Sequence, residues 1–227
     1  MDKKIFAVAV DGPSGAGKST IAKRIAAELG IVYVDTGAMY RSVGLYVFRK
    51  GVDPKDAEAV TALLPEITVD MCYGDDGLQR MILNGEDVTK DIRLPEISMY
   101  ASAVSAIPAV RAFLLEMQRS LARRNSVIMD GRDISTVVLP DAEVKIFLTA
   151  EAETRAKRRE LELMERGTPE PFEKILKELR ERDYNDSHRA EAPLRQAEDA
   201  VLIDTTALNF DESKDALLKV IREKTGA

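Results

Sequence analysis

The chain has 227 residues, 45% of them hydrophobic and 32% charged, which suits a globular protein with one large core and room for an insertion. Its net charge of −6 argues against a general nucleic-acid binder, because such a protein needs a dominant basic surface. The single cysteine, Cys72, excludes an internal disulfide and indicates a reducing compartment, and the single histidine, His188, argues against a histidine metal cluster or a Ser-His-Asp triad.

The sequence predicts no targeting or membrane segment. Only six apolar residues, 5–10, separate Lys4 from Asp11, which is too few for a signal peptide. No stretch approaches the roughly 20 apolar residues of a membrane span. We therefore expect a cytoplasmic monomer that acts on small molecules and binds neither nucleic acid nor a membrane.

A phosphate loop is the first motif in the chain. The apolar run 5–10 predicts a buried strand, and apolar residues at helical spacing over 20–29 predict a helix closed by Gly30. Between them, 12–19 fit the pattern of two glycines five apart followed by Lys and Ser. The expected ATP-binding residues are Gly12, Pro13, Ser14, Gly15, Ala16, Gly17, Lys18, Ser19 and Thr20. We expect Lys18 to reach the β- and γ-phosphates and the Ser19 hydroxyl to hold Mg²⁺.

Residues 31–34 predict a second buried strand, followed by a helix to Arg49 with Thr36 as its N-cap. Tyr40 and Arg41 lie just past the end of this strand, where open parallel sheets bind ligands. Position alone leaves two other roles open, which are core packing for Tyr40 and a solvent-exposed helix face for Arg41.

A small antiparallel sheet is predicted over 65–93. After a short acidic helix near 53–64, alternating apolar and polar residues over 67–73 predict a half-buried strand, and Gly74-Asp75-Asp76-Gly77 predicts a turn. Asn84-Gly85 is a strong signal for a tight hairpin. Such an insertion in a parallel α/β chain could act as a mobile clamp over substrate.

Charged residues follow the third buried strand. Two helices, 97–106 and 110–124, precede this strand at 126–129, which ends in Asp130-Gly131-Arg132-Asp133. Buried charges are costly unless they are paired or functional, and this edge of a parallel sheet favours a ligand site over a structural ion pair. A carboxylate here, Asp130, could hold Mg²⁺ through water.

An arginine-rich helical hairpin follows the fourth strand, 143–149. Its first helix is predicted over 151–166 and its second from Phe172 onward. If the second helix continues, Arg182, Asp186 and Arg189 share one face. The alternative is a solvated charged face, but arginines closing over a transferring phosphoryl group would supply charge where it develops. A fifth strand, 200–204, and a helix, 211–224, complete a five-stranded parallel sheet with helices on both faces.

Three classes of function are compatible with a phosphate loop: a small-molecule kinase, a GTP- or ATP-driven switch, and a non-catalytic nucleotide-binding module. The Asn-Lys-x-Asp base reader of a guanine-specific switch is absent from the sequence. The inserted sheet, the charges at the strand end and the arginine-rich hairpin indicate a second polar substrate, which favours the kinase.

Four motifs together resemble the bacterial cytidylate kinases, within the nucleoside-monophosphate kinase family of phosphate-loop proteins. The motifs are Asp11–Thr20, Asp35–Arg41, Asp130–Asp133, and Arg182-Asp183 with Arg189–Leu194. The resemblance implies transfer of the ATP γ-phosphoryl group to CMP or dCMP with Mg²⁺. It also implies a core of residues 1–36, 95–150 and 195–227, a nucleoside-monophosphate-binding region at 37–94, and a helical lid at 151–194.

The resemblance assigns roles to individual residues. It gives the acceptor phosphate to Arg41, Arg132 and Arg189, the cytosine edge to Ser102, Arg111 and Asp133, and the sugar to Tyr40, Arg182 and Asp186, with Thr36 also at the CMP site. The expected catalytic residues are Lys18, Arg132, Arg155 and Arg159, and Arg158 joins the ATP-binding set. No strong general base is needed, because phosphoryl transfer depends mostly on positioning and charge stabilisation.

Overall fold

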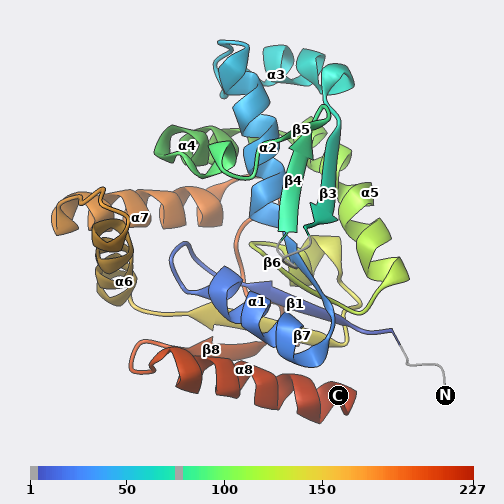
Figure 1. The fold of residues 1–227 in the computed structure, drawn as a ribbon, viewed down its shortest axis with the longest axis vertical. Coiled ribbons are helices and arrows are strands. Elements are labelled where there is room, and N and C mark those ends of the chain that lie inside the picture. The colour runs from blue at the N-terminus through green and yellow to red at the C-terminus, as the bar shows by residue number, and fades with distance from the viewer. Residues whose placement is uncertain (1–4, 75–78) are drawn as a thin grey trace. The chain divides into compact units, whose positions relative to one another are not determined.

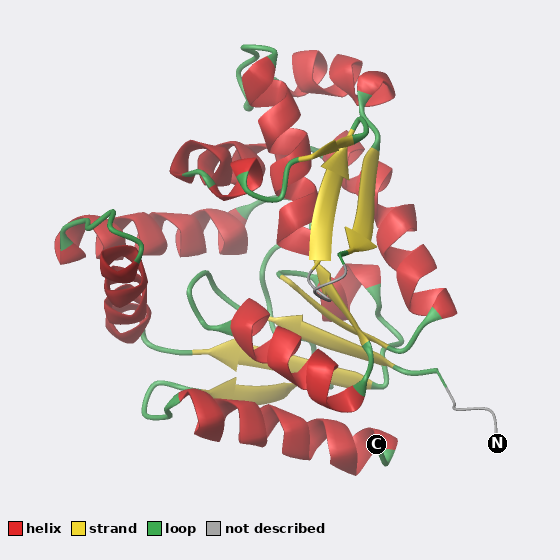
Figure 2. Cartoon of the chain, in the orientation of Figure 1, coloured by secondary structure: helices red, strands yellow, loops and turns green. Residues whose placement is uncertain are grey.

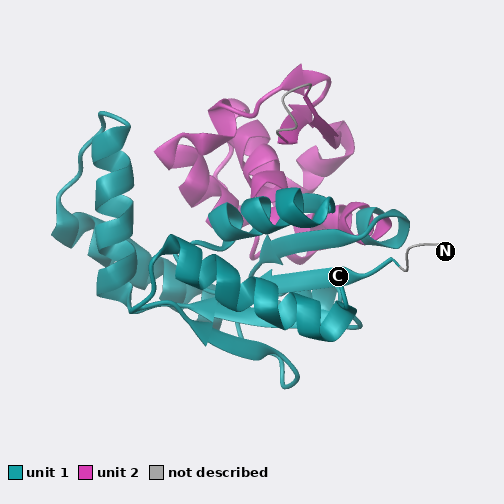
Figure 3. Ribbon diagram, turned by 60° about the horizontal axis from the view of Figure 1, so that its bottom comes forward, with its two compact units in different colours: residues 1–34, 121–227 teal, residues 35–120 magenta. Residues whose placement is uncertain are grey.

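The computed structural model describes residues 5–74 and 79–227, so most of the turn expected at 74–77 lies outside the described residues. The chain divides into two compact units (Figure 3). Unit 1 comprises residues 1–34 and 121–227, and unit 2 comprises residues 35–120. Each unit is described by itself.

Unit 1 is built on a five-stranded sheet in the order β2-β6-β1-β7-β8 (Figure 1). Its strands are β1 (Ala7–Asp11), β2 (Val32–Asp35), β6 (Val127–Gly131), β7 (Val144–Thr149) and β8 (Val201–Asp204). Its helices are α1 (Lys18–Leu29), α6 (Ala152–Glu165), α7 (Phe172–His188) and α8 (Phe210–Thr225). Strand β1 pairs in parallel with β6 and β7, and β7 pairs in parallel with β8, which confirms the predicted parallel sheet with flanking helices.

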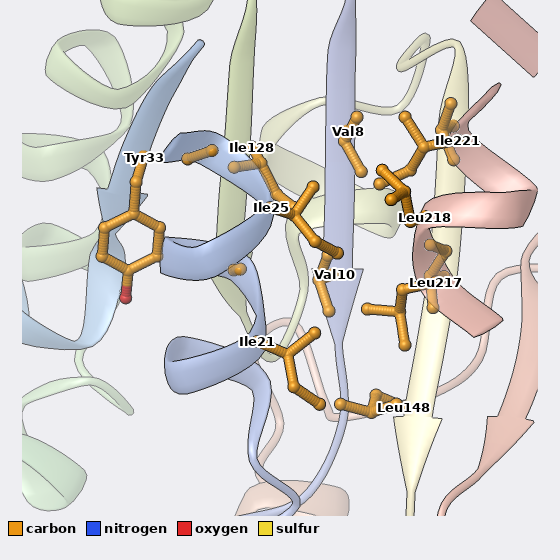
Figure 4. Close-up of a cluster of buried hydrophobic side chains, with 14 of the residues drawn as sticks. Val8, Val10, Ile21, Ile25, Tyr33, Ile128, Leu148, Leu217, Leu218 and Ile221 are labelled. Atoms are coloured by element: carbon orange, nitrogen blue, oxygen red, sulfur yellow. The ribbon is translucent and has the colours of Figure 1, made fainter. Parts of the chain in front are cut away.

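The core of unit 1 lies between the sheet and helices α1 and α8. In Figure 4, Ile25 of α1 and Leu217 of α8 lie beside Val8 and Val10 of the central strand. Met129 of β6 is also fully buried. Strands buried on both faces are continuous apolar runs, which is why the sequence shows them so clearly.

Helices α6 and α7 form a hairpin with its own small core. Ile175, Leu176 and Leu179 of α7 pack against Ala156 of α6. The helical continuation that would place Arg189 on one face with Arg182 and Asp186 stops one residue short. The helix ends at His188, and Arg189 is extended, with φ −64° and ψ 143°. The chain then turns back, and the Leu194 amide donates to the Asp186 carbonyl at 2.8 Å.

In its described residues, unit 2 combines a three-stranded antiparallel sheet, in the order β3-β4-β5, with four α-helices (Figure 2). The strands are β3 (Val69–Tyr73), β4 (Gln79–Leu83) and β5 (Glu86–Asp87), and the helices are α2 (Thr36–Arg49), α3 (Ala57–Leu63), α4 (Pro95–Val104) and α5 (Pro108–Arg124). Asn84 and Gly85 both have positive φ, as the predicted tight hairpin requires. Cys72 of β3 is exposed.

Helix α2 differs from its prediction at its start. Its N-cap is Asp35, whose carboxylate accepts the Ala38 amide at 2.8 Å, so the prediction of Thr36 as N-cap is wrong. Both residue types favour the N-cap position, and the hydrogen bond from the Ala38 amide distinguishes Asp35, so the helix begins one residue earlier than expected. Thr36 is instead the first helical residue and is buried.

Helices α4 and α5 belong mainly to unit 2, whereas the sequence places residues 95–150 with the core. Helix α4 packs closely on α2 at Gly44, where an added Cβ would lie 2.9 Å from the Ala101 nitrogen. This close approach explains why the compact unit extends past 94. The division into core, monophosphate-binding region and lid stays a functional prediction.

Within the described residues, no single helix is long and apolar enough to cross a membrane. Helices α4 and α5 meet that length and hydropathy criterion only when they are taken together, and they are bent by 99° at their junction.

Candidate functional site

The phosphate loop of unit 1 depends on glycine at two positions. Gly12 has φ 149°, and an added Cβ would lie 1.9 Å from the Leu148 carbonyl oxygen of β7, so only glycine fits there. Gly17 has φ 86° and is the N-cap of α1. The loop therefore leads directly to a helix N-terminus, where backbone N–H groups and the helix dipole favour an anion.

Lys18 is folded onto this loop. Its Nζ donates to the Gly12 and Pro13 carbonyl oxygens, both at 2.8 Å, and the residue is buried. Burial, and next to it the positive charge of Arg132, lower the pKa of Lys18 to about 7. A phosphate group in the loop would favour the charged ammonium again. The lysine is thus held where the motif predicts a phosphate ligand.

Ser19 and Asp130 form the candidate metal site. The Ser19 hydroxyl donates to Asp130 Oδ2 at 2.7 Å, and the Tyr33 hydroxyl donates to Asp130 Oδ1 at 2.8 Å. A hydroxyl and a carboxylate are the oxygen ligands that Mg²⁺ prefers, so these residues fit the ion. Among the described residues there is no cluster of three or more His, Cys, Asp or Glu that could hold a metal. Such a sparse protein shell is typical of Mg²⁺ held partly by water and phosphate.

The residues after β6 form a buried charge network with the end of α7. Arg132 Nε donates to Asp186 Oδ2 at 2.7 Å, and Arg189 Nη2 lies 3.3 Å from Asp133 Oδ1. Burial raises the pKa of Asp186, but the charges of Arg132 and Arg182 outweigh it, so the pKa is lowered. The structure therefore brings five of the expected acceptor residues into one cluster of unit 1.

Arg155 of α6 is buried and holds three different segments. Its Nε donates to the Ala150 carbonyl at 2.8 Å, its Nη1 to the Ser14 carbonyl at 2.8 Å, and its Nη2 to Asp183 Oδ2 at 2.7 Å. The side chain is only 6% exposed. All three nitrogens thus donate to protein acceptors, one of which lies in the phosphate loop.

The other two arginines of α6 have different surroundings. Arg158 donates to the Thr205 and Leu208 carbonyls, at 2.6 and 3.2 Å, in the loop after β8. Burial lowers the pKa of Arg158. Arg159 is 37% exposed and forms an ion pair with Glu162 of the same helix. Of the two expected catalytic arginines in the hairpin, Arg159 therefore has the more accessible guanidinium.

The start of α2 in unit 2 holds the expected phosphate ligand Arg41. Its Nη2 lies 3.2 Å from Asp35 Oδ2. Its Nε is buried without a hydrogen-bond partner in the described part of the chain. An unsatisfied buried donor is costly, so an anion bound here would be stabilised.

Unit 2 also brings together Tyr40 and Arg111. The Arg111 guanidinium lies 5.8 Å from the centre of the Tyr40 ring, and its Nη1 donates to the Ser105 carbonyl at 3.3 Å. Ser105 in turn donates to the Ser102 carbonyl at 2.8 Å. Helices α2 and α5 thus place Tyr40, an expected sugar ligand, near Arg111, an expected base ligand.

Sequence reasoning assigned no role to four residues that organise these ligands: Asp11, Tyr33, Ser135 and Asp183. Asp11 accepts the Ile134 and Ser135 amides, Tyr33 orients Asp130, and Asp183 accepts from Arg155. Their partners are distant in sequence, so no local pattern could reveal them. The one available signal is the position of Asp11 at the end of a buried strand.

Comparisons with known proteins agree with the four motifs. The family model described as cytidylate kinase matches residues 8–223. A cytidylate kinase of Caldicellulosiruptor bescii is 51% identical over 213 residues, with 94% of each chain covered. One of Caldicellulosiruptor saccharolyticus is 49% identical over 219 residues, with 96% of each covered. A solved structure of an uncharacterized protein from Eubacterium ventriosum has a TM-score of 0.50 at 16% identity, covers 96% of this chain and 98% of its own, and supports the fold alone.

Proposed function

Because the chain belongs to the cytidylate kinase family, we propose that it transfers the γ-phosphoryl group of ATP to CMP or dCMP, giving CDP or dCDP and ADP. One observation supports two phosphate sites close together. The Ser19 hydroxyl of the donor loop donates to Asp130, two residues before the expected acceptor ligand Arg132, and the charge of Arg132 contributes to the lowered pKa of Lys18 in the same loop. Two cations that repel one another in the free protein both gain from bound phosphates.

The proposed donor site comprises the loop Gly12–Thr20 and Arg158. Backbone N–H groups of the loop and the start of α1 hold the phosphates, and Lys18 reaches the β- and γ-phosphates. Mg²⁺ bound by Ser19, with Asp130 acting through water, supplies charge neutralisation when it is present. The contact between Ser19 and Asp130 supports this assignment.

The proposed acceptor site uses arginines for the phosphate and a carboxylate for the base. Arg41, Arg132 and Arg189 hold the CMP phosphate, while Thr36, Tyr40, Arg182 and Asp186 complete the sugar side. Ser102, Arg111 and Asp133 face the cytosine edge. Cytosine offers an amino donor to Asp133, whereas uracil would present a carbonyl oxygen to it. CMP should therefore be the better acceptor.

The chain's own residues act by positioning and by charge in the transfer step. Lys18, Arg132, Arg155 and Arg159 are the proposed cations around the equatorial oxygens of the phosphoryl group. Arg159 is supported by its exposure, whereas Arg155 would have to exchange a protein acceptor for phosphate. The proposal also takes a monomer in the cytoplasm as the working form.

A coupled assay of ADP release tests this function. The purified protein is given MgATP with CMP, dCMP, UMP, AMP or GMP in turn. Acceptor-dependent ADP release that is fastest with CMP or dCMP is expected. Slow release that no acceptor changes would indicate a nucleotide switch, and no release despite ATP binding would indicate a binding module.

A further inference from the structure

Asp11 is a buried carboxylate that the proposed mechanism does not use. It is the last residue of β1 and is fully buried. Asp11 Oδ1 accepts the Ile134 amide at 2.8 Å, and Oδ2 accepts the Ser135 amide at 2.8 Å and the Ser135 hydroxyl. Burial raises the pKa of Asp11, and the three donors oppose that shift. Both oxygens are thus committed to one short segment.

That segment is a π-helical turn, Ile134–Val138, which follows directly after Asp133. Its hydrogen bonds join residues five apart, for example the Val138 amide, which donates to the Asp133 carbonyl at 3.2 Å. Single π-turns are rare and are frequent at functional sites. The N–H groups that open such a turn have no partner within it, and the Asp11 carboxylate supplies one.

Asp11 contacts the end of β6 and the residues that follow it, once through its backbone and once through its side chain. Its backbone lies opposite Gly131 in the β1–β6 register. Its side chain holds Ile134 and Ser135. Only Arg132 and Asp133 lie between these attachments, and both are expected acceptor ligands. Next in sequence to Asp11 is Gly12, whose carbonyl accepts from Lys18. One residue therefore joins the phosphate loop to the segment that carries Arg132 and Asp133.

We propose that Asp11 is a positioning residue that sets Asp133 and Arg132 for the acceptor and so controls the preference for cytosine over uracil. The inference rests on the proposed function, in which Asp133 faces the base. A carboxylate is required, because an amide at this position would turn an N–H group toward a backbone N–H donor. A shift of Asp133 by a fraction of an ångström is enough to weaken a geometrically selective contact.

The test removes the Ser135 hydroxyl, one of the three donors to the Asp11 carboxylate, and leaves every proposed ligand unchanged. In Ser135→Ala, the kcat/KM ratio of CMP to UMP is expected to fall about tenfold, through a higher KM for CMP, while the KM for ATP stays within about twofold. The ratio does not depend on the fraction of folded enzyme. Ser213→Ala is the matched control, since Ser213 is 3% exposed against 2% for Ser135 and its hydroxyl donates to Asn209 within unit 1. The control should keep the wild-type ratio.

An unchanged CMP to UMP ratio in Ser135→Ala overturns the inference, as does an equal drop in Ser213→Ala. If Ser135→Ala yields no folded protein, Ser135→Cys keeps the volume with a weaker donor, and the same fall in the ratio is required of it. Asp11→Asn should lower the ratio further than Ser135→Ala. Absence of CMP-dependent ADP release from the wild type would instead refute the proposed function itself.

Discussion

Replacing Arg155 by alanine separates two roles for this residue. A cation that only touches the transferring phosphoryl group should affect the rate and leave stability alone. The structure instead shows Arg155 bound to Ala150, Ser14 and Asp183. We therefore expect Arg155→Ala to lower both kcat and the melting temperature of the protein.

The size of the stability loss follows from the partners left behind. Asp183 loses a buried cation, and breaking a fully buried pair costs about 3–5 kcal/mol. The side chain of Asp183 is 24% exposed, so water recovers part of that energy. Two carbonyls also lose their donors, at about 1 kcal/mol each. With about half of the pair's cost remaining, the total of about 4 kcal/mol lowers the melting temperature by roughly 12 °C for a chain of this size.

Calorimetry and steady-state kinetics on the same preparations provide the assay. Arg159→Ala is the matched control, because Arg159 lies on the same helix but forms an exposed pair worth at most about 1 kcal/mol. It should lower kcat more than it weakens acceptor binding and should melt within about 3 °C of the wild type. A wild-type melting temperature for Arg155→Ala, with kcat reduced, would refute the anchoring role and leave only the catalytic one.

Four further outcomes are expected. Lys18→Ala should abolish turnover with an unchanged circular-dichroism spectrum, and near-normal turnover would reject its role at the phosphates. Asp133→Ala should lose more kcat/KM with CMP than with UMP, because both substrates feel the loss of the Arg189 contact but only CMP loses the base contact; equal losses would show that Asp133 does not read the base. Chelation by EDTA should stop turnover and added Mg²⁺ should restore it. Full activity in EDTA would show that turnover does not require the metal. Because the pKa of Asp186 is lowered, its ionised carboxylate stabilises the fold at pH values above 3.8, the ordinary pKa of an aspartate, and this stabilisation is lost as the pH falls below that value. The melting temperature of Asp186→Asn should therefore vary less with pH than that of the wild type below about pH 4.

Most of the fold could be predicted because its signals are local. Buried parallel strands are short apolar runs, and the hairpin at Asn84-Gly85 requires positive φ values that these residues tolerate. Element ends were harder to predict. Asp35 and Thr36 are both good N-caps, and only the hydrogen bond from Ala38 distinguishes them. The strand order was not predicted at all, since parallel strands pair without regard to sequence neighbours.

The ligands of the candidate site could be predicted from the sequence, but the residues that hold these ligands in position could not. The phosphate loop and the charged end of β6 follow recognisable patterns. The contact of Arg155 with Ser14 spans 141 positions, and that of Asp11 with Ser135 spans 124. No periodicity connects such residues. Three-dimensional packing therefore decides which arginine is accessible and which carboxylate holds a turn.

The exposed thiol on β3 has a practical consequence for spectroscopy. Cys72 is the one cysteine in the sequence, so a maleimide dye will attach at a single position and mark residues 35–120 without any prior mutagenesis. Adding a second cysteine at an exposed position such as Lys219 of α8 creates a donor–acceptor pair with one dye on each unit. Energy transfer between the dyes, recorded while ATP and CMP are added in turn, would then report the distance between the two labelled positions in each nucleotide state.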